Sequence, residues 1–176
     1  MVVYYTVVKE HTRERVFSAL FQKMGIDPHQ TIEKDQNGRP YLAQAPTVGI
    51  SMSHADNLTV YAISDAPVGV DIESPDAIRD PLKISRRFFT DGERAYVENA
   101  GDTARAACEI WTKKEALAKY FGNGLSKNLN RDTTSDEFSP NFSTKFTTID
   151  QKTYCVTIFA PHSAEIVALT AKDLEF

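Results

Sequence analysis

Two carboxylates are separated by a single residue in a short apolar segment, GVDIE, at residues 69–73. The β-branched residues favour a strand here, and side chains two residues apart in a strand point to the same face. Asp71 and Glu73 would then stand side by side, with Cα atoms about 6.6 Å apart. Val70 and Ile72 would face the opposite side. Like charges at this spacing repel each other, so the pattern predicts a compensating group near the two carboxylates.

A second group of ionisable residues lies on the longest predicted helix, within residues 102–124. Lys114 falls inside the apolar stripe of that helix, where it either extends its ammonium to water or needs a buried partner. Glu115 and Lys119 are spaced i, i+4 beside the stripe, which is also the spacing of an ordinary surface ion pair. Together with the two carboxylates of GVDIE they favour a Mg²⁺ and phosphate site, because oxygen ligands suit this ion.

Polar residues at two predicted turns are further candidates for binding an anion. Ser53 and His54 end a predicted strand. They are adjacent in the sequence and therefore unlike a nucleophile–base pair, so a Ser-His hydrolase is not indicated. A turn hydrogen bond and a phosphate contact both remain open for them. Arg39 follows the Asn37-Gly38 turn, where it is either a plain surface arginine or an anion contact.

The elements that would position these residues follow an α+β order. Residues 2–8 favour a strand and 12–25 a helix, and short extended segments follow up to residue 73. The region 80–101 is expected to form two helices before the long one. Strands return near the C-terminus, so the order is β, α, several β, several α, then β.

Three local signals refine this outline. Thr90 and Glu93 fit a capping box that would start a helix. Residues 126–142 are polar and contain turn formers, so a long loop is expected. The last two apolar segments, 152–160 and 164–170, are expected to pair as a hairpin around Pro161.

Composition narrows the class of protein. The chain has 176 residues, of which 41% are hydrophobic and 25% charged, as in ordinary globular proteins. The net charge of −4 argues against nucleic acid or an anionic membrane surface as the partner. No apolar run approaches the ~20 residues of a membrane helix, and the N-terminus predicts a strand rather than a signal peptide. Cys108 and Cys155 lack metal or redox spacing, so reduced core cysteines and a cytoplasmic location are expected.

These segments resemble the 4′-phosphopantetheinyl transferase superfamily. The most specific pair is GVDIE (69–73) and WTKKEALAKYFGNGL (111–125). The weaker segments NGRPYL (37–42), ISMSHADN (50–57) and RRFFTDGE (86–93) occur in the order that the family shows. The resemblance covers roughly residues 35 to 125 and favours the Sfp-type branch, of which this chain would be a short member.

The resemblance implies a role for each matching residue near the metal. Asp71, Glu73 and Glu115 match the Mg²⁺-binding carboxylates of the family, so that the ion and the pyrophosphate of coenzyme A would compensate the carboxylate pair. Lys119 matches the lysine that contacts the pyrophosphate, and Lys114 matches the other lysine of the motif, also expected at the coenzyme. Glu115 and Lys119 would be the catalytic residues.

The resemblance also implies contacts with the rest of the coenzyme and with a partner protein. Ser53 and His54 match the pair near its phosphates, with His54 at the 3′-phosphate, and Arg39 and Pro40 match the segment that borders the adenine. The region 83–94 matches the part that meets the carrier protein.

The implied reaction moves 4′-phosphopantetheine from coenzyme A to a serine of an apo acyl or peptidyl carrier protein and releases adenosine 3′,5′-bisphosphate. The implied fold has two similar α/β subdomains related by pseudo-twofold symmetry, expected at residues 1–66 and 67–176 of a monomer. The same residues are also compatible with two alternative functions. One is a Mg²⁺-dependent enzyme that hydrolyses another phosphate, and the other is a degenerate relative that only binds carrier proteins.

Overall fold

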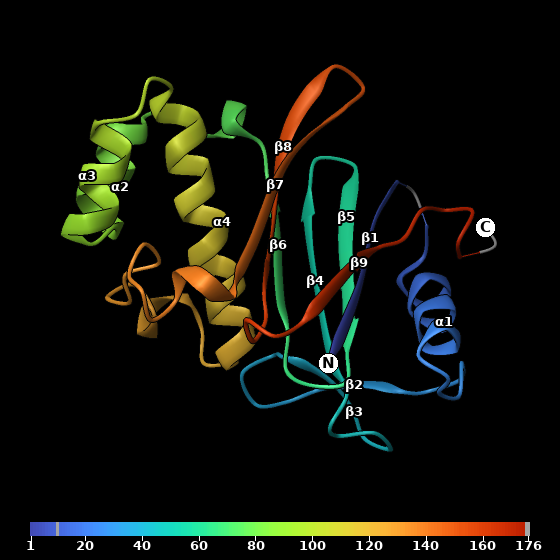
Figure 1. The fold of residues 1–176 in the computed structure, drawn as a ribbon. Coiled ribbons are helices and arrows are strands. Elements are labelled where there is room, and N and C mark those ends of the chain that lie inside the picture. The colour runs from blue at the N-terminus through green and yellow to red at the C-terminus, as the bar shows by residue number, and fades with distance from the viewer. Residues whose placement is uncertain (10, 175–176) are drawn as a thin grey trace.

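A computed structural model describes residues 1–9 and 11–174 (Figure 1). Two β-sheets pack face to face, with a single helix, α1 (Arg13–Lys23), on the outer face of the first sheet. The outer face of the second sheet is covered by α4 (Thr103–Phe121). Figure 1 shows α1 on one side of the strands and the other helices on the opposite side. The expected α+β class is confirmed.

The first sheet has the strand order β4-β5-β1-β9. Its members are β1 (Val2–Lys9), β4 (Gly49–Ala55), β5 (Leu58–Ser64) and β9 (Glu165–Ala168). Residues of β5 alternate between two buried faces. Tyr61 and Ile63 pack with Phe17 of α1, whereas Val60 and Ala62 face the second sheet. A short hairpin of β2 (Ile32–Lys34) and β3 (Pro40–Leu42) leaves this layer and forms its own sheet.

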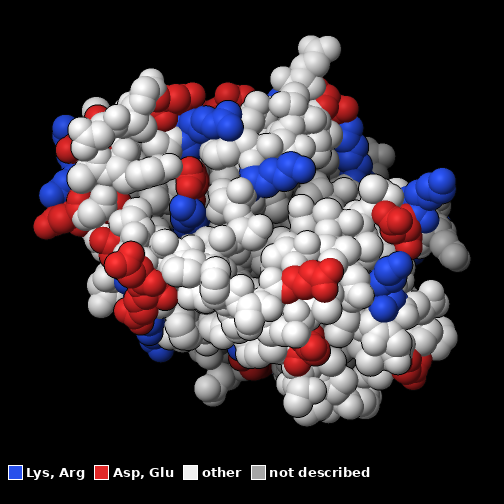
Figure 2. All heavy atoms as spheres, viewed as in Figure 1, with Lys and Arg blue, Asp and Glu red and all other residues white. Residues whose placement is uncertain are grey.

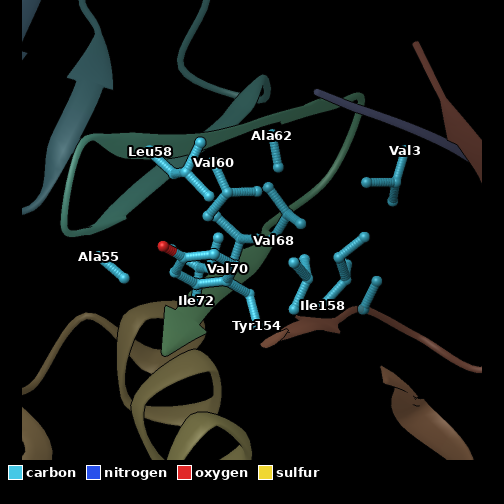
Figure 3. Close-up of a cluster of buried hydrophobic side chains, with 12 residues drawn as sticks. Val3, Ala55, Leu58, Val60, Ala62, Val68, Val70, Ile72, Tyr154 and Ile158 are labelled. Carbon is cyan, nitrogen blue, oxygen red and sulfur yellow. The ribbon is translucent and has the colours of Figure 1, made fainter. Parts of the chain in front are cut away.

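The second sheet has the order β6-β8-β7 and is antiparallel. Its strands are β6 (Gly69–Glu73), β7 (Phe142–Ile149) and β8 (Lys152–Phe159). Val70 and Ile72 of β6 point into the core between the sheets, where Tyr154 and Ile158 meet them (Figure 3). The opposite face of β6, which carries the two carboxylates, is turned to α4. The predicted alternation of this strand is therefore confirmed.

The helices α2 (Pro81–Phe88) and α3 (Asp91–Glu98) form a separate small core with the first half of α4. The Thr90–Glu93 capping box is present at the start of α3, as predicted. Asp102 caps α4, and Gly122 ends it in the left-handed conformation, with φ of 66°. Among the helices of the described residues, none combines the length and apolar character needed to cross a bilayer.

Two expectations near the C-terminus are wrong. The segments 152–160 and 164–170 do not form a hairpin, because β9 pairs in parallel with β1 in the first sheet. The hairpin partner of β8 is β7, a strand missing from the sequence outline. The turn between them places Asp150 and Gln151 at φ of 49° and 65° without a glycine, so the usual hairpin signal was absent.

Residues 126–142 are less loop-like than expected. Short 3₁₀ turns occur at Leu125–Lys127 and Ser139–Asn141, and Asn128 and Thr133 are fully buried. The segment therefore packs against the helices instead of extending freely into solvent.

Candidate active site

A glycine brings the carboxylate-bearing strand against the long helix. A Cβ atom added at Gly69 would meet the backbone of α4, with Tyr120 N at 2.7 Å and the Ala116 carbonyl carbon at 2.9 Å, and the Ala116 oxygen closer still. Real Cβ contacts of this kind are excluded by van der Waals repulsion, so only glycine permits this approach. The close packing of β6 on α4 is what places Asp71 and Glu73 opposite Glu115 and Lys119.

Asp71 is the centre of the polar contacts between these two elements. Its side chain is buried, and Oδ1 accepts hydrogen bonds from Lys119 Nζ at 2.8 Å and Ser53 Oγ at 2.6 Å. Lys119 also donates to the carbonyl oxygen of Val70, at 3.1 Å. Burial raises the pKa of Asp71, while the Lys119 charge opposes that rise. The compensating group that the sequence required is thus, in this structure, an ammonium on α4.

The other two carboxylates are less well compensated. Burial raises the pKa of Glu73 to about 7, and repulsion from Asp71 and then Glu115 adds to that effect. Burial, followed by repulsion from Asp71, likewise raises the pKa of Glu115. Lys119 lowers both pKa values but is already engaged with Asp71. Negative charge therefore exceeds positive charge at this cluster, which is the condition for binding a further cation.

A pocket of about 400 Å³ begins at this cluster. It lies between the β2–β3 hairpin, α1, β4 and the C-terminal part of α4, and Glu115 and Lys119 are in its wall. Three more cationic side chains line it, namely Arg13, Lys34 and Arg39. Four cations with one carboxylate indicate a pocket for an anionic ligand.

The remainder of the pocket wall is largely apolar. Phe17, Ile50 and Met52 contribute from α1 and β4, and Leu125 contributes from the turn after α4. Ligand pockets commonly combine such apolar walls with a few placed polar groups. The mixture suits a ligand that carries both phosphates and an apolar or aromatic part.

The structure brings Arg39 and Pro40 to this pocket, and their place beside an adenine stays a prediction. Arg39 lies across the end of α4, where a Cβ atom at Gly122 would come within 2.7 Å of its Cδ. Asp35 holds the turn before it, accepting hydrogen bonds from the backbone N–H groups of Asn37 and Arg39. The hairpin therefore presents Arg39 from a fixed turn.

Ser53 and His54 do not line the pocket. Ser53 faces β6 and donates to Asp71, and its neighbour on the same face, Ser51, accepts from Val70 N at 3.1 Å. His54 is exposed, on the same face of β4 as the pocket residue Met52 and one step further along. The Ser53 hydroxyl thus orients a carboxylate here, and its predicted contact with phosphate stays a prediction, as does that of His54.

Lys114 is placed behind the site and away from the pocket. Its side chain is fully buried, so the option of an ammonium extended to water is wrong. The buried partner is Glu93, whose Oε2 lies 2.7 Å from Lys114 Nζ. No local pattern in the sequence marks Glu93, the glutamate of the α3 capping box, as the counter-ion of a lysine on α4.

The donor set of the carboxylate cluster fits a hard divalent cation. All the ligand atoms would be oxygens, as Mg²⁺ prefers. Asp71 Oδ2 is buried and accepts no hydrogen bond from the described residues, so it is an acceptor available to a cation. In this conformation, however, no three His, Cys, Asp or Glu side chains in the described parts of the chain converge closely enough to hold a metal ion.

Several pocket residues were not assigned from the sequence. Arg13, Lys34, Ile50 and Met52 line the pocket, but no local pattern in the sequence marks them. They come from three separate elements, so their meeting depends on tertiary packing. The one available signal was the position of Lys34 and Arg39 on either side of a hairpin turn.

Comparisons with known proteins identify the family. The family model of the 4′-phosphopantetheinyl transferase superfamily matches residues 67–169, which include both motif segments and extend past the range of the resemblance to β9. The residues before 67 lie outside that match.

Curated relatives are similar over part of their length. The 4′-phosphopantetheinyl transferase psf-1 of Bacillus pumilus is 35% identical over 99 residues, covering 55% of this chain and 42% of the relative. The 4′-phosphopantetheinyl transferase gsp of Aneurinibacillus migulanus is 30% identical over 131 residues, covering 70% and 54%. The 4′-phosphopantetheinyl transferase Sfp of Bacillus subtilis strain 168 is 29% identical over 91 residues, covering 51% and 40%.

The chain thus spans about half the length of the curated relatives that it matches. The family match itself covers more than half of the chain and contains Asp71, Glu73, Glu115 and Lys119. This chain belongs to the 4′-phosphopantetheinyl transferase superfamily.

Proposed function

We propose that this protein transfers 4′-phosphopantetheine from coenzyme A to a serine hydroxyl of an apo acyl or peptidyl carrier protein, with release of adenosine 3′,5′-bisphosphate. The observation that carries the proposal is the meeting of Asp71, Glu73, Glu115 and Lys119 where β6 crosses α4, beside a pocket rimmed by cations. Family membership and the printed activity of the relatives support the same reaction.

The pocket would hold the nucleotide part of coenzyme A. Lys119 would contact the pyrophosphate, since its Nζ is at the carboxylate end of the pocket and 29% of its side chain is exposed. Arg39 and Pro40 would border the adenine, and Arg13 and Lys34 are cations in reach of the same pocket. Phosphoryl transfer depends mainly on such positioning and on stabilisation of developing charge.

Asp71, Glu73 and Glu115 would hold Mg²⁺, which when bound offsets charge on the pyrophosphate oxygens. The protein's own residues supply the rest of the chemistry. Glu115, raised in pKa by burial and by Asp71, would accept the proton of the attacking serine, directly or through a water molecule. Lys119 would place a positive charge next to the leaving group.

The carrier protein would dock at residues 83–94. Lys83, Arg86 and Arg87 are exposed on α2, and Arg87 lies over the ring of Phe88 at 5.0 Å. Carrier proteins are typically acidic, so exposed cations suit them. On the face shown in Figure 2, basic and acidic side chains are interspersed, which favours a local contact over a broad basic field.

The proposal includes a monomer in a reducing compartment such as the cytoplasm. The monomer rests on the family resemblance, and the reducing compartment is supported by both cysteines being free and buried. Division into subdomains 1–66 and 67–176 is proposed because each half pairs a helix with an antiparallel sheet, although residues 165–168 return to the first sheet. Sedimentation of the purified protein tests the monomer.

Intact-protein mass spectrometry tests the reaction. An apo acyl carrier protein is incubated with coenzyme A and Mg²⁺, with and without this protein, and with a Glu115→Gln variant and an EDTA control alongside. We expect the carrier to gain one phosphopantetheine group only with metal and with Glu115 intact. Binding of coenzyme A without any gain in mass, across several carriers, would instead favour the non-catalytic binder. Release of inorganic phosphate would favour the hydrolase.

A further inference from the structure

The buried Lys114–Glu93 pair is fully occupied by contacts within the protein. Both side chains are completely inaccessible to solvent. Besides its ion pair with Glu93, Lys114 Nζ donates to the carbonyl oxygens of Leu129 at 2.9 Å and Arg131 at 3.2 Å. An ammonium has three protons, and these three acceptors use all of them.

Glu93 is equally saturated. Its Oε2 also accepts from the backbone N–H of Thr90 at 2.9 Å. Its Oε1 accepts from Thr133 twice, from the backbone N at 2.9 Å and from Oγ1 at 2.8 Å. The pair therefore ties three segments together, namely the start of α3, the middle of α4 and residues 129–133. Buried polar networks in which every member is satisfied hold their segments rigidly.

The segment that Lys114 holds is continuous with the wall of the pocket. Asn128, also fully buried, donates from Nδ2 to the carbonyl oxygen of Gly124 at 2.6 Å and to Asn123 Oδ1 at 2.5 Å. Gly124 and Leu125 line the pocket. A few residues of chain and one buried amide thus connect segment 129–133 to the pocket.

We propose that Lys114 is a positioning residue that acts through Glu93, and that it makes no contact with the coenzyme. Together the two residues fix segment 128–133 and, through it, the wall formed by Gly124 and Leu125. This differs from the coenzyme contact that the family resemblance implied. The consequence for coenzyme A rests on the proposed function, whereas the fixing of the segment does not.

Coenzyme A binding to a Glu93→Gln variant separates the two roles of Lys114, because only the positioning role predicts weaker binding. If Lys114 contacted phosphate, loss of the competing carboxylate would leave or increase its affinity for the coenzyme. If it positions the wall, the dissociation constant for coenzyme A with Mg²⁺, measured by calorimetry, should rise by about tenfold, the effect of one weakened charged hydrogen bond. Lys114→Met should raise this dissociation constant in the same way. The loss of binding free energy in the double variant should be smaller than the sum of the losses in the two single variants.

Amide hydrogen exchange tests the segment without any ligand. Thr133→Val removes the hydroxyl donor to Glu93 at nearly constant size, and Thr133→Ser keeps it. We expect exchange in peptides covering 128–133 to accelerate about tenfold in the valine variant and to stay near wild type in the serine variant. Lys113→Met is the control for charge on α4, because Lys113 pairs with Glu109 outside this network.

The possible outcomes are distinct. Unchanged exchange at 128–133 in both Thr133→Val and Lys114→Met overturns the proposal, as does unchanged or tighter coenzyme A binding by Glu93→Gln. If wild-type protein binds no coenzyme A, the proposed function fails, and the exchange data still decide the positioning role. If Glu93→Gln does not fold, the paired Thr133 variants provide the same decision.

Discussion

Replacing Gly69 by alanine tests whether close packing of β6 on α4 builds the site. The added methyl group would lie 2.7 Å from Tyr120 N and 2.9 Å from the Ala116 carbonyl carbon, and closer still to the Ala116 oxygen. These are backbone atoms in the last two turns of a 19-residue helix, so no side chain can rotate away to make room. The strand and the helix must move apart.

The size of the effect follows from these contacts. Overpacking of a tight core costs about 1–3 kcal/mol, and the upper end applies where backbone opposes the new group. For a domain of this size about 3 kcal/mol corresponds to a fall in melting temperature of roughly 6–12 °C. Separation by about 1 Å would also stretch the 2.8 Å Lys119–Asp71 pair well beyond hydrogen-bond length. We therefore expect the Gly69→Ala protein to lose transferase activity even at temperatures at which it remains folded.

The assay is thermal unfolding followed by circular dichroism, together with carrier modification measured by mass spectrometry at 20 °C. Gly101→Ala is the matched control, because a Cβ atom there meets nothing within 4 Å. It should melt within about 1 °C of wild type, as surface substitutions usually do. A Gly69→Ala protein with wild-type melting and wild-type transfer would refute the argument that this contact positions the carboxylates.

Three further predictions concern the site and the second sheet. Lys119→Met leaves the buried Asp71 with Ser53 as its one side-chain partner, so urea unfolding should show a free energy of unfolding lower by about 2 kcal/mol. This is less than for a fully buried pair, because Lys119 is partly exposed. A decrease as small as that of Lys113→Met would contradict the prediction. The pKa of Glu73 is raised from 4.5 to about 7, so ionising it in the folded, metal-free protein opposes folding, and the melting temperature in EDTA should fall as pH rises across that interval. Glu73→Gln should flatten the fall and Mg²⁺ should reverse it, whereas an identical pH profile in wild type and variant would exclude this role. Gln151→Gly should stabilise the protein by about 0.5–1 kcal/mol in thermal unfolding, because Gln151 holds φ of 65°; destabilisation would show that its side chain matters more than its backbone.

Local patterns were predictable because neighbouring residues determine them. The alternation of β6 followed from side chains two apart, and the α3 capping box followed from Thr90 and Glu93 three apart. Non-local pairing was not predictable in the same way. β9 was expected beside β8 but pairs with β1, at the other end of the chain. Parallel strands are not joined by a short turn, so no turn residues in the sequence mark this pairing.

The sequence by itself determined the chemistry of the candidate site, through residue types at fixed spacing on one strand and one helix. Tertiary structure decided which of those groups meet. Gly69 lets β6 approach α4, so Lys119 reaches Asp71, while Lys114, five residues before it, points away into a buried pair with Glu93. At 100° per residue, five positions turn a helix by 500°, so the two ammonium groups leave α4 about 140° apart. Only the packing around α4 shows which direction leads to the pocket and which to the core.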